Sequence, residues 1–240
     1  TDEEREDPNF MKFLKLEATV SQTRCVEMIL QNNISIVHGP PGCGKTSSIS
    51  LFVYHLLKKS ISEKKRILLT AYSNQAVENI AKFVSPIVKA LGKKMVWITR
   101  KGFDFETKTD FLEASEEEKN LSVYKILTRN TKEAIKFKNL QEIKWDLNVK
   151  KRDYKRAQRE NKYFQGGKPR RFSLNEQNQM DDIRSKIEQS LVFEADVVCS
   201  TLLSSAKRNM VDFKFDYVFI DEASQANQTV SIIPLIHHPS

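Results

Sequence analysis

The stretch Val37–Ser48, VHGPPGCGKTSS, decides the fold of this chain of 240 residues. It contains the pattern G-x-x-x-x-G-K-[ST] from Gly39 to Thr46, whose glycines let the backbone close around a chain of phosphates. The apolar segment Ile34–Val37 predicts a short buried strand before the loop, and apolar residues at helical spacing predict a helix over Thr46–Lys58 after it. A strand, a glycine-rich loop and a helix in this order predict a phosphate-binding βα unit.

The residue types of this loop fit the chemistry of a nucleoside triphosphate. Backbone N–H groups from Gly42 to Lys45 can converge on phosphate oxygens, because glycine permits the dihedral angles that this requires. The Lys45 ammonium would neutralise the β- and γ-phosphates, and the Thr46 hydroxyl would be a ligand of Mg²⁺. We therefore predict a nucleotide-binding segment made of Gly39, Pro40, Pro41, Gly42, Cys43, Gly44, Lys45, Thr46 and Ser47.

Four further apolar segments predict the rest of a sheet. They are Ile67–Thr70, Met95–Thr99, Val197–Ser200 and Tyr217–Ile220. A helix is expected from about Gln75 until Pro86, where the missing N–H and the ring of proline should end it. Five apolar strands separated by helical patterns predict an α/β fold of the P-loop NTPase type, with one doubly wound parallel sheet that is interrupted once.

The interruption, residues 102–194, has a helical pattern of its own. Glu133–Tyr163 lacks strong helix breakers, and a turn is expected at Gly166–Pro169. Ser173 and Glu176 have the spacing of a capping box that opens a second helix. The segment is predicted to be an antiparallel helical hairpin.

The net charge of +8 is concentrated in this hairpin. Between Lys144 and Arg171 there are eleven basic side chains and three acidic ones, so the rest of the chain is neutral on balance. Such a surplus is typical either of a surface that binds a polyanion or of a solvated helix face with no partner. Charge alone leaves both interpretations open.

Other patterns narrow the class of protein. The apolar runs are short and the first ten residues are acidic, so we expect neither a membrane span nor a secretory signal, and an intracellular location. Cys25, Cys43 and Cys199 are odd in number and far apart, which indicates reduced thiols rather than disulfides or a zinc site.

A carboxylate pair follows the last predicted strand. Asp221 at its carboxyl end can hold the hydration shell of Mg²⁺, and Glu222 can act as a general base for water. An apolar run ending in Asp-Glu is a weak signal alone, but together with the glycine loop it favours an NTP hydrolase over a kinase, which must exclude water.

At this point the chain resembles the superfamily 1 helicases of the up-frameshift and senataxin group. The resemblance rests on DEASQ at Asp221–Gln225, on Ser21-Gln22, on AYSNQAV at Ala71–Val77 and on VCST at Val198–Thr201. It extends over residues 19–234. It implies a RecA-like ATP-binding domain at 19–101 and 195–240, an accessory helical subdomain at 102–194 and an N-terminal extension at 1–18.

The resemblance also implies roles for single residues. Gln22 would read the adenine edge, although Thr19-x-x-Gln22 is also a capping box that would occupy the same side chain. Gln225 would sense the γ-phosphate or the attacking water. The implied catalytic residues are Lys45, Asp221, Glu222 and Gln225, and the implied metal ligands are Thr46 and Asp221.

Single-stranded RNA or DNA is the implied partner. Small polar side chains at strand ends would contact the sugar-phosphate backbone, although they could equally be turn and N-cap residues. The implied contacts are Ser73, Asn74, Arg100, Ser200 and Thr201, with Lys150, Lys151, Arg152, Lys155 and Arg156 of the basic helix.

The resemblance has departures and limits. Tyr72 stands where the family usually has proline, and Cys43 replaces threonine. A second RecA-like domain is expected beyond Ser240, so hydrolysis by these residues alone should be incomplete. We expect the ATP- and Mg²⁺-dependent motor domain of a 5′-to-3′ helicase, located in the nucleus or cytoplasm. The alternatives are an ATP-switched nucleic-acid-binding scaffold and an AAA+ type ATPase.

Overall fold

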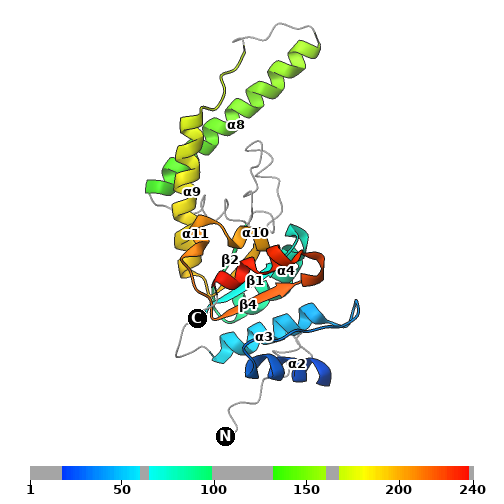
Figure 1. Ribbon diagram of the computed structural model, residues 1–240. Coiled ribbons are helices and arrows are strands. Elements are labelled where there is room, and N and C mark those ends of the chain that lie inside the picture. Colours follow the sequence, from blue (N-terminus) through cyan, green and yellow to red (C-terminus); the bar gives the residue numbers. More distant parts are fainter. Residues whose placement is uncertain (1–17, 60–64, 99–131, 161–167, 238–240) are drawn as a thin grey trace. The chain divides into compact units, whose positions relative to one another are not determined.

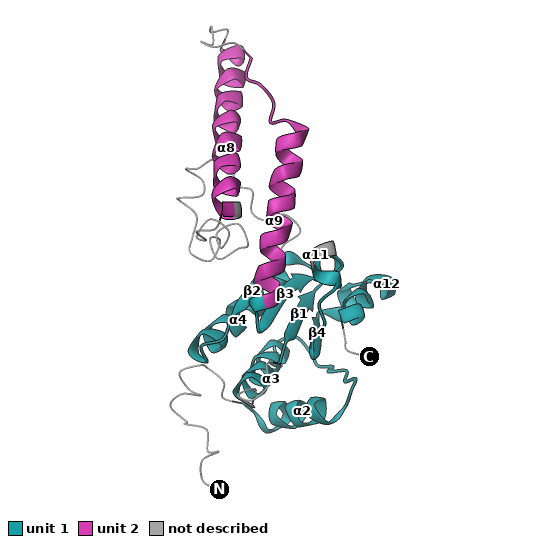
Figure 2. Cartoon of the chain, turned by 90° about the vertical axis from the view of Figure 1, so that its left-hand side faces the viewer, with its two compact units in different colours: residues 1–96, 194–240 teal, residues 97–193 magenta. Residues whose placement is uncertain are grey.

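A computed structural model of the chain describes residues 18–59, 65–98, 132–160 and 168–237 (Figure 1). The chain divides into two units, residues 1–96 with 194–240 and residues 97–193 (Figure 2). The first unit holds the glycine-rich loop and nearly all of the sheet, so it is the unit that positions the candidate site.

The sheet has four described strands in the order β2-β3-β1-β4. Their bounds are β1 Ile67–Ala71, β2 Met95–Ile98, β3 Val197–Thr201 and β4 Tyr217–Asp221. β1 pairs in parallel with both β3 and β4, with Leu69 opposite Cys199 on one side and Phe219 on the other. β1 and β3 are buried along their whole length, as expected for parallel strands inside a sheet, and the burial includes the polar residues Thr70, Ser200 and Thr201. The predicted parallel α/β sheet is confirmed.

Two helices of the first unit pack next to this sheet, and a third packs on one of them. α4, Asn74–Ala90, contacts β1 and β3, whereas α3, Lys45–Lys59, packs next to α4. The Phe52 ring of α3 meets the rings of Tyr217 and Phe219 edge-on, with centroids 5.7 and 5.0 Å apart, so α3 is also anchored on β4. α2, Val20–Gln31, packs against α3.

The strand predicted at Ile34–Val37 does not form. These residues have no strand structure, and the side chains of Ile34 and Ile36 are 86% and 87% exposed. β4 is therefore the edge of the described sheet. The prediction was wrong because an apolar pattern measures the tendency to be buried, whereas a strand also needs a neighbour that takes its backbone hydrogen bonds. Here a cavity separates this segment from β4.

The predicted end of a helix at Pro86 is also wrong, because α4 continues to Ala90. Pro86 lies on the exposed side of the helix, while Ile87 and Val88 after it are 1% and 2% exposed. Burial of those two side chains outweighs the hydrogen bond that proline cannot donate. The helix then ends through hydrogen bonds from Leu91 N–H to the carbonyls of Ile87 and Lys89.

Short helical segments follow β3 and β4. They are α10 Leu202–Ser205, α11 Arg208–Val211, η2 Ala223–Gln225, α12 Gln228–Ser231 and η3 Ile233–His237. The buried His237 ring joins the end of η3 to α10 and to the residues after α11, because Nδ1 lies 2.9 Å from the Phe213 carbonyl oxygen and Nε2 lies 2.8 Å from that of Ser205.

The second unit contains two long helices, α8 Lys132–Arg159 and α9 Leu174–Glu194, which run in opposite directions (Figures 1 and 2). This confirms the antiparallel hairpin, although Gly166 and Gly167 of the predicted turn lie outside the described residues. The predicted capping box forms, since Ser173 N–H donates to Glu176 Oε2 and Glu176 N–H donates to Ser173 Oγ. Among the described helices of both units, none is long and apolar enough to cross a membrane.

Candidate nucleotide-binding site

The glycine-rich loop needs glycine at two positions. Gly42 and Gly44 have φ angles of +79° and +84°, in the left-handed region that side chains with a Cβ rarely adopt. α3 begins directly afterwards at Lys45, so the loop ends at a helix N-terminus whose first N–H groups have no partner within the helix. This is the backbone arrangement that the sequence predicted for an anion site.

The Lys45 side chain folds over the loop. Its ammonium donates to the carbonyl oxygens of Gly39 at 2.7 Å and Pro40 at 2.9 Å. These carbonyls hold a positive charge at the mouth of the loop, where a phosphate could take their place as the partner of the ammonium. Thr46 and Ser47, in the first turn of α3, are half-buried.

The Cys43 residue is exposed, but its sulfur lies close to other residues of the loop. A methyl group on Gly39 would approach Cys43 Sγ to 2.6 Å, and Sγ lies 4.0 Å from Lys45 Nζ. The Cys43 N–H donates to the Pro40 carbonyl at 3.4 Å, a long hydrogen bond that a phosphate oxygen could replace. Cys43 therefore fills the space that the missing side chain of Gly39 leaves open.

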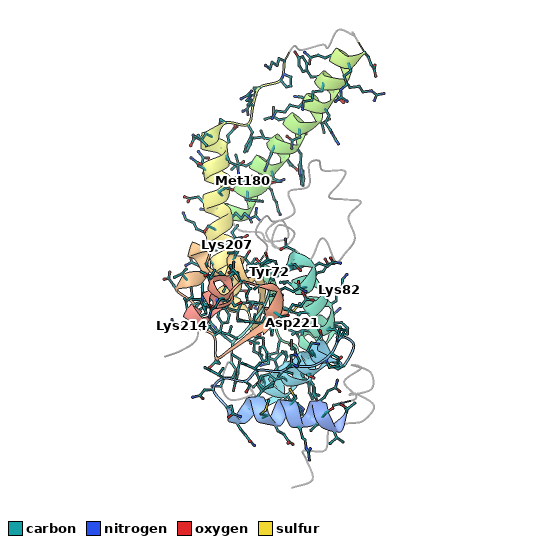
Figure 3. The ribbon with its side chains drawn as sticks, turned by 45° about the vertical axis from the view of Figure 1, so that its right-hand side comes forward. Tyr72, Lys82, Met180, Lys207, Lys214 and Asp221 are labelled. Atoms are coloured by element: carbon teal, nitrogen blue, oxygen red, sulfur yellow. The ribbon has the colours of Figure 1, made fainter. Side chains whose placement is uncertain are left out.

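The carboxylate pair lies where β4 ends. Asp221 is opposite Ala71, the last residue of β1, and is labelled in Figure 3 near Tyr72, which follows β1. Asp221 Oδ1 accepts the N–H of Glu222 at 2.9 Å. Glu222 is exposed and has a φ of +51°, a conformation that is uncommon for residues other than glycine and occurs more often at functional sites. Its carbonyl accepts the N–H of Gln225 at 2.9 Å.

A cavity of about 1020 Å³ in the first unit brings these parts together. It extends along β4 and reaches the glycine-rich loop. The residues of the predicted site among those lining it are Gly39, Pro41, Lys45, Asp221, Glu222 and Gln225. The structure therefore gathers all four predicted catalytic residues around one space, large enough for a nucleotide.

Gln22 lies beside the loop and uses both ends of its side-chain amide. Oε1 accepts the N–H of Thr19 at 2.9 Å, and the Gln22 N–H donates to Thr19 Oγ1 at 3.3 Å, so the alternative reading as a capping box is correct. Nε2 donates to the carbonyl of Gly44 at 3.3 Å. No local sequence pattern indicates this last contact, because Gln22 and Gly44 are 22 residues apart in the sequence.

Two of the small polar residues at the strand ends are helix N-caps in this structure. Ser73 is the N-cap of α4 and accepts the Ala76 N–H at 3.1 Å, and Asn74 follows it on the surface. Thr201 is the N-cap of α10, and it is 7% exposed, whereas Ser200 is fully buried. Contact of Ser200 and Thr201 with a nucleic acid gains no support from their burial and stays a prediction.

The basic residues predicted to bind nucleic acid lie on α8 in the second unit. Lys151 is half-buried, and the exposed ones are Lys150, Arg152, Lys155 and Arg156. Arg156 pairs with Glu160 at 3.1 Å, a surface ion pair that a phosphate can replace at small cost. Arg100 lies outside the described residues.

Two hydroxyl groups that the sequence analysis did not single out support the site. Ser48 is buried, and both its N–H and its Oγ donate to the Gly44 carbonyl, at 2.9 and 3.1 Å. Thr70 in β1 donates 2.7 Å to the carbonyl of Phe219, which joins the strand that carries Asp221 to the centre of the sheet. A serine one turn into a helix and a threonine in a buried strand are common, so neither pattern marks a function by itself.

Comparison with known proteins identifies the family. The family described as "AAA domain" matches residues 17–240. The chain belongs to this family. It is 29% identical over 230 residues to the ATP-dependent helicase NAM7 of Saccharomyces cerevisiae, and the matched region covers 95% of this chain and 19% of that protein.

Two more relatives agree. The chain is 28% identical over 221 residues to a protein named "Regulator of nonsense transcripts 1 homolog" of Arabidopsis thaliana, covering 92% of this chain and 15% of that protein. It is 26% identical to Helicase sen1 of Schizosaccharomyces pombe, covering 89% and 15%. The resemblance to the up-frameshift and senataxin group is confirmed, and the scaffold and AAA+ type alternatives are not favoured. The chain spans less than a fifth of the length of these relatives.

Proposed function

We propose that this chain is the ATP-binding motor domain of an ATP-dependent helicase, which couples ATP hydrolysis to 5′-to-3′ movement on single-stranded RNA or DNA. The observation that carries the proposal is that one cavity is lined by Lys45, Asp221, Glu222 and Gln225 together. These are the groups that ATP hydrolysis needs: a cation for the phosphates, a carboxylate for the metal, a base for water and a sensor. The name of the relative NAM7 adds the ATP-dependent helicase activity, whereas the single-stranded polymer and the direction of movement come from the resemblance to the up-frameshift and senataxin group.

The loop would bind the triphosphate, and each polar group would have one task. The N–H groups at the start of α3 and the Lys45 ammonium would hold the phosphate oxygens, with Lys45 leaving the carbonyls of Gly39 and Pro40. Glu222 would accept a proton from the attacking water. Gln225 is hydrogen bonded through its backbone to Glu222, so a change at the γ-phosphate would be transmitted to the turn after β4.

The residues present fit a magnesium ion. Asp221 Oδ1 already accepts one backbone N–H, which leaves Oδ2 for the ion or its water shell, and Thr46 would add a hydroxyl oxygen. Mg²⁺ would supply positive charge to the phosphate oxygens.

A single strand of RNA or DNA would bind at the carboxyl edge of the sheet in the first unit, and the basic residues of α8 in the second unit would form a contact surface of their own. Ser73 and Asn74 lie at that edge, where a hydroxyl and an amide can bond to the backbone of any nucleotide. Exposed lysines and arginines on α8 would add contacts that weaken with salt. A second RecA-like domain would complete the ATP interface, so we expect the 240 residues alone to hydrolyse ATP slowly and to unwind nothing.

The test is nucleotide binding and steady-state ATP hydrolysis, measured with and without poly-RNA and single-stranded DNA. We expect ATP binding, slow turnover and stimulation by at least one polymer. Glu222→Gln should keep ATP binding and abolish turnover, because the amide cannot take a proton. The proposal fails if the chain does not bind ATP, or if turnover is unchanged in Glu222→Gln.

A further inference from the structure

Three donors converge on one carbonyl of the phosphate loop. The Gly44 oxygen accepts the N–H of Ser48 at 2.9 Å, Ser48 Oγ at 3.1 Å and Gln22 Nε2 at 3.3 Å. Two of the three donors come from α3 itself, and the third comes from α2. Gln22 is therefore the only one of them that ties a separate helix to the loop.

The direction of this carbonyl sets the direction of a phosphate-binding N–H. The Gly44–Lys45 peptide bond is trans, so the Lys45 N–H points away from the Gly44 oxygen. This N–H belongs to the first residue of α3, whose opening N–H groups have no partner within the helix. Fixing the oxygen from one side therefore aims the N–H toward the other side, where a phosphate would lie.

The orientation of the Gln22 amide follows from its partners. The Thr19 N–H can only donate, so it must face Oε1, and the Gly44 oxygen can only accept, so it must face Nε2. A methyl group on Gly44 would overlap Nε2, which shows how closely this side chain approaches the loop backbone.

We infer that Gln22 is a positioning residue for the phosphate loop, which holds the Gly44–Lys45 peptide so that the Lys45 N–H faces the phosphates. This inference rests on the proposed nucleotide binding and adds to it a role of Gln22 that requires no base. It predicts that Gln22 contributes to the binding of every polyphosphate, including one that carries no adenine.

The test compares ATP with inorganic tripolyphosphate in titration calorimetry of the full chain, at fixed salt and Mg²⁺. Gln22→Met has a similar length but neither accepts from Thr19 nor donates to Gly44. Thr19→Ala is the matched control, because it also removes one hydrogen bond of the capping box but leaves both ends of the Gln22 amide in place. Thermal melting of both variants checks that they are folded.

We expect Gln22→Met to weaken tripolyphosphate binding about fivefold, the equivalent of one hydrogen bond of about 1 kcal/mol, and Thr19→Ala to leave it unchanged. If Gln22→Met weakens ATP but not tripolyphosphate, Gln22 reads the base alone and the inference is overturned. Equal weakening of tripolyphosphate by Thr19→Ala would also overturn it, because the effect would then come from the cap of α2. An unmodified chain that binds neither ligand would overturn the proposed function, and with it this inference.

Discussion

Gly42 and Gly44 form a matched pair for testing the structure of the phosphate loop. Both have positive φ angles that differ by only a few degrees, so replacing either by alanine introduces the same kind of backbone strain. Their surroundings differ. A methyl group on Gly42 would meet nothing within 4 Å, whereas a methyl group on Gly44 would overlap Gln22 Nε2.

The expected losses of stability follow from this difference. A left-handed conformation costs an alanine about 1–2 kcal/mol, and this applies to both variants. In Gly44→Ala the end of the flexible Gln22 side chain must also swing away, which removes its hydrogen bond to the Gly44 carbonyl and costs about 1 kcal/mol more. Gly44→Ala should therefore be about 1 kcal/mol less stable than Gly42→Ala.

Urea unfolding without nucleotide, followed by circular dichroism, measures this gap. The two variants are compared once with Gln22 present and once in a Gln22→Ala background, which makes a double-mutant cycle. The gap should disappear when Gln22 is absent, because Gly44→Ala then has no side chain to displace. Equal losses in the presence of Gln22, or a gap that persists without it, would refute the contact between α2 and the loop.

Three further predictions concern other parts of the chain. Burial raises the pKa of the Cys25 thiol and Cys43 is exposed, so a maleimide at neutral pH should react first at Cys43. Bound nucleotide should slow this reaction, and Cys43→Thr should remove it while keeping the ATP turnover rate within a few-fold of that of the unmodified chain. The hydrogen bonds from the Arg170 guanidinium and from Ser173 lower the pKa of Glu176 to about 2, below its ordinary value of 4.5. The ionised carboxylate therefore stabilises the fold fully above pH 4.5, and this contribution is lost as the pH falls toward 2, so the melting temperatures of the unmodified chain and Glu176→Gln should converge over that range. Thr70→Val leaves the Phe219 carbonyl without its 2.7 Å donor, and urea unfolding should show a loss of about 1 kcal/mol.

The sequence predicted those parts of the fold that depend on local patterns. The runs Ile67–Leu69 and Val197–Cys199 are apolar, and the strands that they begin are the two fully buried ones, because a strand buried on both faces shows such a run rather than an alternation. The loop and the capping box at Ser173 also follow from short, local chemistry. The errors lie where a distant neighbour decides. Ile34–Val37 lacks a strand partner, and the helix passes Pro86 because Ile87 and Val88 are buried.

The same distinction applies to Gln22, for which the sequence allowed two roles. A capping box and an adenine contact both use the side-chain amide, and nothing in the local pattern chooses between them. In the structure the amide caps α2 with its oxygen and holds Gly44 with its nitrogen, so neither end is free in this conformation. Reading the base would therefore require Gln22 to give up a contact with the helix cap or with the phosphate loop. If Gln22 breaks its hydrogen bond to the Gly44 carbonyl, it can contact the base only by no longer holding the Lys45 N–H toward the phosphates. If it gives up the cap, the amide oxygen can turn to the adenine while the loop stays in place, and only this second case allows Gln22 to serve both ends of one nucleotide.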